Sequence, residues 1–244
     1  GTTFGYIDAM AEMAEEYPDV IFLHCSGYLN NDTNFANYFG KMYQPRYLSG
    51  LAAGAMTDSN KIGYVAAFPI PEVIRGINAF AAGVNEVNPE ATVEVVWTFT
   101  WFGPEAETQA ANALLEKGAD VLAQHQDSTA TGLAAEAAGA KWISYNTAYG
   151  QDSAPEAFVT APVWDWGPYY VNIVEQIIDG TFTTESYWGG METGLVSLYD
   201  LSSDVPSDTA TLIAEKTEAI IDGTLEVEIV EEEFISNVIG TVNP

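Results

Sequence analysis

The sequence predicts an α/β fold in which parallel strands alternate with helices. Short apolar runs are separated by longer stretches whose apolar residues recur at helical spacing, and this alternation continues over most of the 244 residues. Hydrophobic residues make up 48% and aromatic residues 12% of the chain, which is enough to bury a sizeable core. Strands that alternate with helices in this way are typical of βαβ units and a parallel sheet.

The first 145 residues carry the regular part of this pattern. Residues 8–17 have apolar side chains at helical spacing, Pro18-Asp19 ends that pattern, and residues 20–24 have the apolar character of a strand. Asn88-Pro89 is a turn signal between a helix and the next strand. By the same criteria we expect helices over 43–56, 72–87, 105–117 and 131–138, and strands over 61–67, 91–98, 120–124 and 141–145.

The remaining elements are less regular. We expect strands over 158–163 and 194–198, and helices over 168–178 and 208–221 that end at Asp179-Gly180 and Asp222-Gly223. The tail from Glu226 alternates acidic and apolar residues before three consecutive glutamates. This pattern fits either an edge strand or a solvated extension.

The charge balance excludes some classes of partner. Asp and Glu number 35 against 7 Lys and Arg, which gives a formal charge of −28. Nucleic acids and anionic membrane surfaces are bound through clusters of basic residues, and here the basic residues are scattered singly. Because salt screens the self-repulsion of such an acidic surface, we expect a salty environment. The alternative is a very soluble acidic protein without a salt requirement.

Aromatic and polar residues follow the expected strands. In an open parallel sheet the ligand binds beyond the carboxyl ends of the strands, so these positions are the candidates for a binding site. Five of the six tryptophans, all except Trp142, lie in or near such loops. The pattern favours a pocket that holds a flat ligand between aromatic faces. The candidates are Phe68, Trp101, His125, Gln126, Asp127, Asn146, Trp164, Trp166 and Trp188.

No catalytic, metal or cofactor motif accompanies these residues. The sequence contains no GxGxxG, P-loop, GxSxG, HExxH or calcium-binding Asp-x-Asp-x-Asp-Gly motif, and it has only two histidines. His125 with Asp127 has the composition of an acid–base pair, but no nucleophile is spaced to join it, so ligand hydrogen bonding is favoured. Cys25 is the single cysteine, which excludes an internal disulfide, and no apolar run is long enough to span a membrane.

Several of these segments together resemble one family. These segments are YQPRYLSG (43–50), FPIPEVIRGINAF (68–80), QHQDS (124–128), WDWGPYY (164–170) and YWGGM (187–191). The resemblance covers residues 1–225 and identifies the chain as similar to the basic membrane protein (BMP) family of ABC-transporter substrate-binding proteins.

The resemblance implies a type I periplasmic-binding-protein fold, with two α/β lobes of parallel sheets flanked by helices and a ligand enclosed between them. The first lobe is expected to comprise residues 1–58 and about 164–184, and the second 59–163 and about 185–225, with 226–244 as a C-terminal extension. Family members carry a further strand–helix block before the segment that matches residues 1–6. The first lobe is therefore expected to be incomplete at its N-terminus, as in a fragment or a split assembly.

The family binds purine nucleosides or related bases. The positions of its ribose-binding Asp and Lys correspond to Asn146 and Trp164, so the charge-assisted bonds to ribose are lost and a free nucleobase is expected instead. The ring is expected to stack on Trp164 or a neighbouring aromatic residue, with Gln126, Asp127 or Asn146 reading its edge. Thr3, Phe4 and Tyr6 match a family loop and are expected to face the ligand from the first lobe.

The resemblance implies an importer component without catalytic activity. It would capture a purine base outside the cytoplasmic membrane, periplasmic or extracellular and lipid-anchored in a full-length form, and deliver it to an ABC permease. The alternatives are purine nucleoside binding, a sensory or self-assembling subunit on the same fold and, least favoured, a nucleoside hydrolase or phosphorylase. No cofactor is expected.

Overall fold

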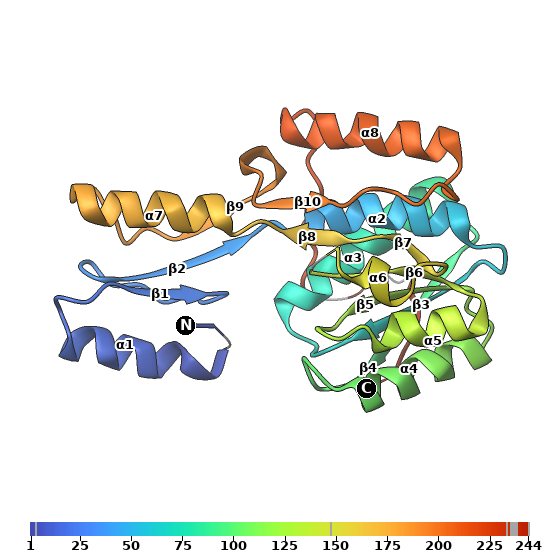
Figure 1. Cartoon of the computed structure of the whole chain (residues 1–244), viewed down its shortest axis with the longest axis horizontal. Helices are drawn as coiled ribbons and strands as arrows, with labels where there is room; N and C mark the ends of the chain where they lie inside the picture. Colours follow the sequence, from blue (N-terminus) through green and yellow to red (C-terminus); the bar gives the residue numbers. More distant parts are fainter. Residues whose placement is uncertain (3, 147, 233, 235–238, 244) are drawn as a thin grey trace. The chain divides into compact units, whose positions relative to one another are not determined.

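The computed structural model describes residues 1–2, 4–146, 148–232, 234 and 239–243, and divides the chain into two units. The smaller unit comprises residues 1–41 and 165–196, and the larger unit comprises residues 42–164 and 197–244. Each unit contains a parallel β-sheet with helices packed on it (Figure 1).

The smaller unit is built on a three-stranded parallel sheet in the order β1-β2-β9. Figure 1 shows α1 on one face of this sheet and α7 on the other. Its elements are η1 (Phe4–Tyr6), α1 (Ile7–Glu16), β1 (Phe22–Cys25), β2 (Phe35–Gly40), α7 (Gly167–Asp179), β9 (Tyr187–Gly189) and η2 (Met191–Thr193). Tyr38 of β2 stacks on Tyr169 of α7, with ring centroids 4.7 Å apart, so aromatic packing joins the sheet to this helix.

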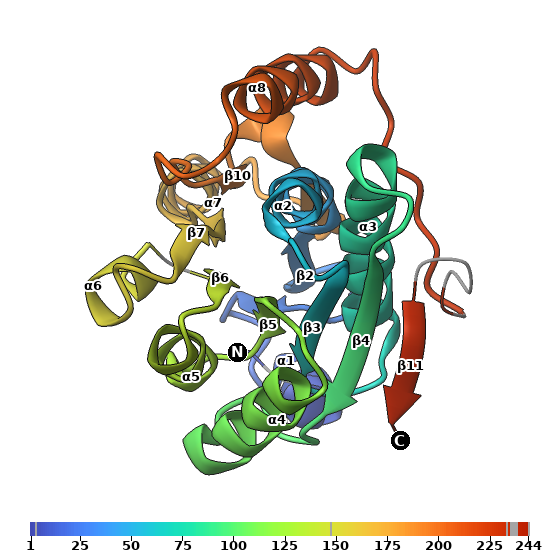
Figure 2. The ribbon, with the colours of Figure 1, turned by 90° about the vertical axis from the view of Figure 1, so that its right-hand side faces the viewer.

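The larger unit is built on a six-stranded parallel sheet in the order β11-β4-β3-β5-β6-β7. Helices α2 and α3 cover one face, α4 and α5 cover the other, and α8 packs on α2 (Figure 2). Its elements are α2 (Tyr43–Met56), β3 (Lys61–Ala66), α3 (Pro71–Val87), β4 (Thr92–Trp97), α4 (Pro104–Glu116), β5 (Val121–His125), α5 (Ala130–Ala138), β6 (Lys141–Ile143), α6 (Gly150–Ser153), β7 (Phe158–Thr160), β8 (Pro162–Trp164), β10 (Val196–Leu198), α8 (Ser207–Ile221) and β11 (Ile239–Asn243).

Helices α2 and α3 approach each other at two glycines. A Cβ atom at Gly50 would lie 2.0 Å from the carbonyl oxygen of Phe80, and one at Gly83 would lie 2.1 Å from the carbonyl oxygen of Tyr47. Only glycine therefore fits at either position without moving the helices apart. This close packing groups α2 with the larger unit.

The grouping differs from the expected domain boundaries. Helix α2 was expected in the first lobe but belongs to the larger unit, and residues 185–196 were expected in the second lobe but belong to the smaller unit. The run 158–163, expected as one strand, forms β7 and the start of β8, which belong to different sheets. Strands β2 and β9 were not expected, because neither has alternating apolar residues.

The C-terminal segment, whose sequence left two readings open, includes an edge strand. Strand β11 pairs in parallel with β4. Before it, the chain runs along the outer side of α3, where Asn78 Nδ2 donates to the carbonyl oxygen of Val230 at 2.7 Å. None of the helices described is both long and apolar enough to cross a membrane.

Candidate functional site

The strand order of the larger unit locates a binding site. Strand β3 comes first in the chain, β4 lies on one side of it and β5 on the other. In a sheet of this order the chain reverses its winding direction between the strands corresponding to β3 and β5, and ligands bind beyond their carboxyl ends. The loops after β3, β4, β5 and β6 are therefore the candidate site. We call them, together with Trp164 at the end of β8, the strand-end surface.

Three aromatic residues form one side of the strand-end surface. Phe68 follows β3 and lies 5.3 Å from Trp101 and 6.4 Å from Phe99, between ring centroids. Phe99 is 52% exposed and has a φ of +54°, a conformation that is uncommon for a bulky residue. Such backbone strain is often found at functional sites, and here it holds an aromatic side chain in contact with solvent.

Three polar groups continue the strand-end surface beyond the aromatic residues. Trp164 Nε1 donates to Asn146 Oδ1 at 3.1 Å, and Asn146 Nδ2 donates to Asp127 Oδ1 at 2.6 Å. The backbone N–H of Asp127 donates to the carbonyl oxygen of Trp101 at 3.0 Å, which ties the loops after β4 and β5 together. Asn146 has a φ of +69°, the left-handed conformation that asparagine tolerates.

The Asp127 carboxylate is partly desolvated, although the residue as a whole is exposed. Burial of the carboxylate raises the pKa of Asp127, and the hydrogen bond from Asn146 and the nearby His125 oppose that shift without cancelling it. The carboxylate is thus a strong hydrogen-bond acceptor in a partly apolar setting.

A buried ionic cluster supports the strand-end surface from below. Arg46 of α2 is fully buried, and its guanidinium carbon lies 4.1 Å from the ring centroid of Tyr145. Its Nη1 donates to the carbonyl oxygen of Gln124 at 2.7 Å. His125 Nε2 lies 3.2 Å from Glu72 Oε1, so the imidazole carries its proton on Nε2 and donates it to the carboxylate.

The charges in this cluster follow from burial and from the neighbouring groups. Burial alone would raise the pKa of Glu72, but His125, Arg75 and Arg46 outweigh it, and the pKa of Glu72 is lowered. Burial lowers the pKa of His125, and the Arg46 charge adds to this effect. Near pH 7 the cluster therefore contains an ionised Glu72, a neutral His125 and a charged Arg46.

The structure brings five of the expected site residues together at the strand-end surface: Phe68, Trp101, Asp127, Asn146 and Trp164. Two others lie beneath it. His125 is 3% exposed and pairs with Glu72, while Gln126 is 1% exposed and donates from Nε2 to Thr98 Oγ1 at 2.6 Å. Arg46, Glu72 and Tyr145 were not among the expected site residues. Arg46 and Glu72 lie in two of the segments that carry the family resemblance, but nothing in the sequence shows that these distant positions meet.

The remaining candidates belong to the smaller unit. Trp166 packs in an aromatic cluster, 5.4 Å from Tyr38 and 6.2 Å from Tyr170 between ring centroids. Trp188 is 41% exposed and Tyr6 is 58% exposed. Phe4 lies in η1 by its backbone, whereas its side chain and the whole of Thr3 lie outside the described residues.

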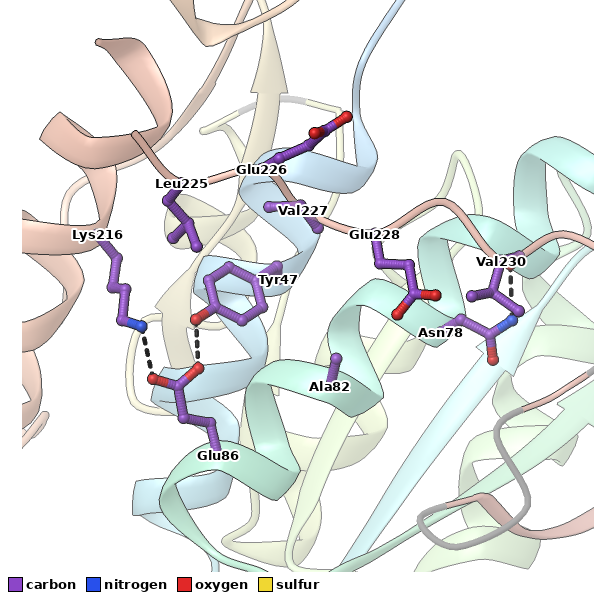
Figure 3. Close-up of a pocket in the computed structure, with 10 residues that line it drawn as sticks. All are labelled: Tyr47, Asn78, Ala82, Glu86, Lys216, Leu225, Glu226, Val227, Glu228 and Val230. Carbon is purple, nitrogen blue, oxygen red and sulfur yellow. Dashed lines mark hydrogen bonds and ion pairs between the residues drawn. The ribbon is translucent and has the colours of Figure 1, made fainter. Parts of the chain in front are cut away.

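A hollow elsewhere in the larger unit is a less suitable site. This cavity of about 210 Å³ lies between α2, α3, α8 and the segment 225–230 (Figure 3). Its strongest polar groups bind each other, because Tyr47 and Lys216 both donate to Glu86. Among the residues that the structure describes, no group of three or more His, Cys, Asp or Glu side chains is arranged to hold a metal ion.

Comparisons with known proteins agree with this arrangement. The chain is 45% identical over 227 residues to a putative ABC transporter glucose-binding protein of Haloferax volcanii, covering 93% of this chain and 58% of that protein. It is 40% identical over 225 residues to a purine-binding protein of Brucella abortus, covering 90% of this chain and 62% of that protein. The chain thus spans about three fifths of the length of these curated relatives.

Solved structures show the same fold. An ABC transporter solute-binding protein from Conexibacter woesei matches with a TM-score of 0.73 at 25% identity, covering 93% of this chain and 77% of that one. A second solute-binding protein, from Aeropyrum pernix, matches with a TM-score of 0.80 at 16% identity, covering 95% of this chain and 76% of that one. The expected type I periplasmic-binding-protein fold is thereby confirmed. The family model of PnrA-like ABC transporter substrate-binding proteins matches residues 1–231, and the chain therefore belongs to this Bmp family.

Proposed function

We propose that this chain captures a purine base, or a related flat heterocycle, for an ABC importer and that the ligand binds at the strand-end surface of the larger unit. The observation that supports this most is a group of solvent-accessible aromatic rings joined to a hydrogen-bonded carboxylate. Phe68 contacts Phe99 and Trp101, and the backbone of Trp101 accepts a hydrogen bond from that of Asp127. Aromatic faces stack on a planar ring, and the carboxylate accepts from its edge.

Glucose is the second candidate, because the 45% identical relative is named as a putative glucose-binding protein. A hexose presents several hydroxyl groups, and each one that is buried needs a hydrogen-bond partner. At the strand-end surface the amide of Asn146 is already engaged by Trp164 and Asp127. This surface therefore favours a ring with few polar groups over a sugar.

The family supports a role in transport rather than in catalysis, because its model describes substrate-binding proteins of ABC transporters. Such proteins work outside the cytoplasmic membrane, periplasmic or extracellular, and pass their ligand to a permease. The same proposal has three further parts. The protein carries a lipid anchor, its two units are the two lobes of the family fold, and the transported ligand is a purine.

Thermal unfolding of the purified protein with adenine, guanine, hypoxanthine and glucose tests the proposal. A bound ligand at 100 times its Kd adds about 2.7 kcal/mol, which corresponds to roughly 5–11 °C in Tm for a protein of this size. We expect such a shift with at least one purine base and none with glucose, and chromatography should recover the base unchanged. A shift with glucose alone would contradict purine binding. Release of a base from a nucleoside would indicate an enzyme.

A further inference from the structure

The hydrogen bonds between Trp164, Asn146 and Asp127 have a fixed direction. An indole N–H only donates and an ionised carboxylate only accepts. Asn146 Oδ1 must therefore accept from Trp164 at 3.1 Å, and its Nδ2 must donate to Asp127 Oδ1 at 2.6 Å. The orientation of the Asn146 amide, which is often ambiguous, is set by its two partners.

This direction gives the two polar residues different roles. Asn146 uses one side-chain N–H and one lone pair of its side-chain oxygen within the protein, and its backbone N–H donates to the carbonyl oxygen of Pro162 at 3.0 Å. It is therefore a positioning residue. In the part of the chain described, Asp127 Oδ1 has a donor whereas Oδ2 has none, so Oδ2 is the acceptor that remains for a ligand.

The loop that carries this acceptor is joined to an aromatic pair. The Asp127 backbone is bonded to the Trp101 carbonyl oxygen at 3.0 Å, and the Trp101 ring lies 5.3 Å from that of Phe68. A planar ring stacked on these side chains would bring its edge to the carboxylate. An edge that carries only acceptors or alkyl groups would leave the charge without a partner and would be rejected.

We propose, building on the proposed function, that Asp127 selects heterocycles with an N–H donor at the ring edge, such as oxo- and aminopurines. Trp164 and Asn146 act by holding the carboxylate in the accepting position. Rings of the same size in which every N–H has been replaced by an N-alkyl group are excluded. Loss of a hydrogen bond to a charged group lowers affinity by about tenfold to a hundredfold.

Methylated xanthines test this selectivity in the intact protein. Theophylline, theobromine and paraxanthine each retain one N–H, whereas caffeine retains none and differs from each of them by one methyl group. Isothermal titration should show at least one of the three dimethylxanthines binding tenfold or more tightly than caffeine. That preference should be lost in Asp127→Leu, whose unfolding temperature should stay close to that of the wild type because Asp127 is exposed.

Trp164→Phe tests the positioning role separately. It keeps an aromatic face but removes the N–H that orients Asn146, so the preference for dimethylxanthine over caffeine should fall severalfold while caffeine affinity changes little. A preference unchanged in Asp127→Leu, or caffeine bound as tightly as the dimethylxanthines by the wild type, would overturn the selectivity and leave purine binding intact. If the wild-type protein binds neither a purine base nor a xanthine, the proposed function itself fails.

Discussion

Removing the Glu72 carboxylate should strongly destabilise the larger unit. Arg46 is fully buried, and the described residues that hold its guanidinium are Gln124, through its carbonyl oxygen at 2.7 Å, and Tyr145 and Tyr64, through their rings at 4.1 and 5.6 Å. Glu72 supplies the negative charge in this cluster. Glu72→Leu would leave the Arg46 charge uncompensated in a buried site.

Leaving a buried charge without the opposite charge that compensates it costs about 3–5 kcal/mol. For a unit of this size that corresponds to a fall of roughly 6–20 °C in Tm. Calorimetry and urea unfolding measure it, with Glu90→Leu as the control, because Glu90 lies exposed in the turn after α3 and should change stability by less than about 0.5 kcal/mol. Glu72→Gln, which keeps the shape but not the charge, should fall between the two.

The pH dependence provides an independent check. The folded protein lowers the pKa of Glu72 below 4.5, so its stabilising contribution is fully present above that value and is lost as the pH falls through the folded pKa. The stability difference between wild type and Glu72→Leu should therefore shrink under acid conditions. Equal stability of the two proteins at pH 7, or a difference that does not change on acidification, would refute this account of the cluster.

Three further outcomes follow from the structure. Gly83→Ala should destabilise the protein by about 1–3 kcal/mol in urea unfolding, because its Cβ would meet the Tyr47 carbonyl oxygen at 2.1 Å. Gly76→Ala on the same helix should be tolerated, because no atom lies nearer than 3.8 Å to the Cβ position there. Equal effects of the two substitutions would contradict the close helix packing. Trp164→Ala should weaken purine binding by about 1–3 kcal/mol through lost stacking, and an unchanged titration would move the stacking residue elsewhere. Because burial raises the pKa of Asp127, purine affinity should fall on acidification at a higher pH than the 3.8 of an ordinary aspartate; an affinity independent of pH down to that value would exclude Asp127 as the acceptor.

The regular helices and strands of the larger unit were predictable from the sequence because hydrophobic periodicity reports which face of an element is buried. Helix α3 (71–87) and strand β4 (92–97) agree with expectation to within one residue at each end. Pro162 explains why residues 158–163 do not form the single strand that was expected. It has no N–H to donate, and β7 ends just before it while the chain continues as β8 in another sheet.

Tertiary grouping could not be predicted in the same way. A helix pattern shows an apolar face but not the sheet that covers it, so the membership of α2 depended on the contact between Gly50 and α3, which no periodicity reveals. The sequence did indicate Asp127, Asn146 and Trp164 as neighbours at strand ends, because parallel strands end at one edge of a sheet. It did not indicate that Asn146 positions the Asp127 carboxylate, since the direction of hydrogen bonds depends on side-chain geometry.

A crystal structure of the protein with a bound purine base tests the central claim most directly. We predict that the ring lies against the aromatic side chains of the strand-end surface and that one of its N–H groups donates to Asp127 within hydrogen-bond distance. A purine bound with neither Asp127 nor Trp164 in contact would contradict the account. Glucose bound at the strand-end surface with its hydroxyls paired there would contradict the proposed ligand class.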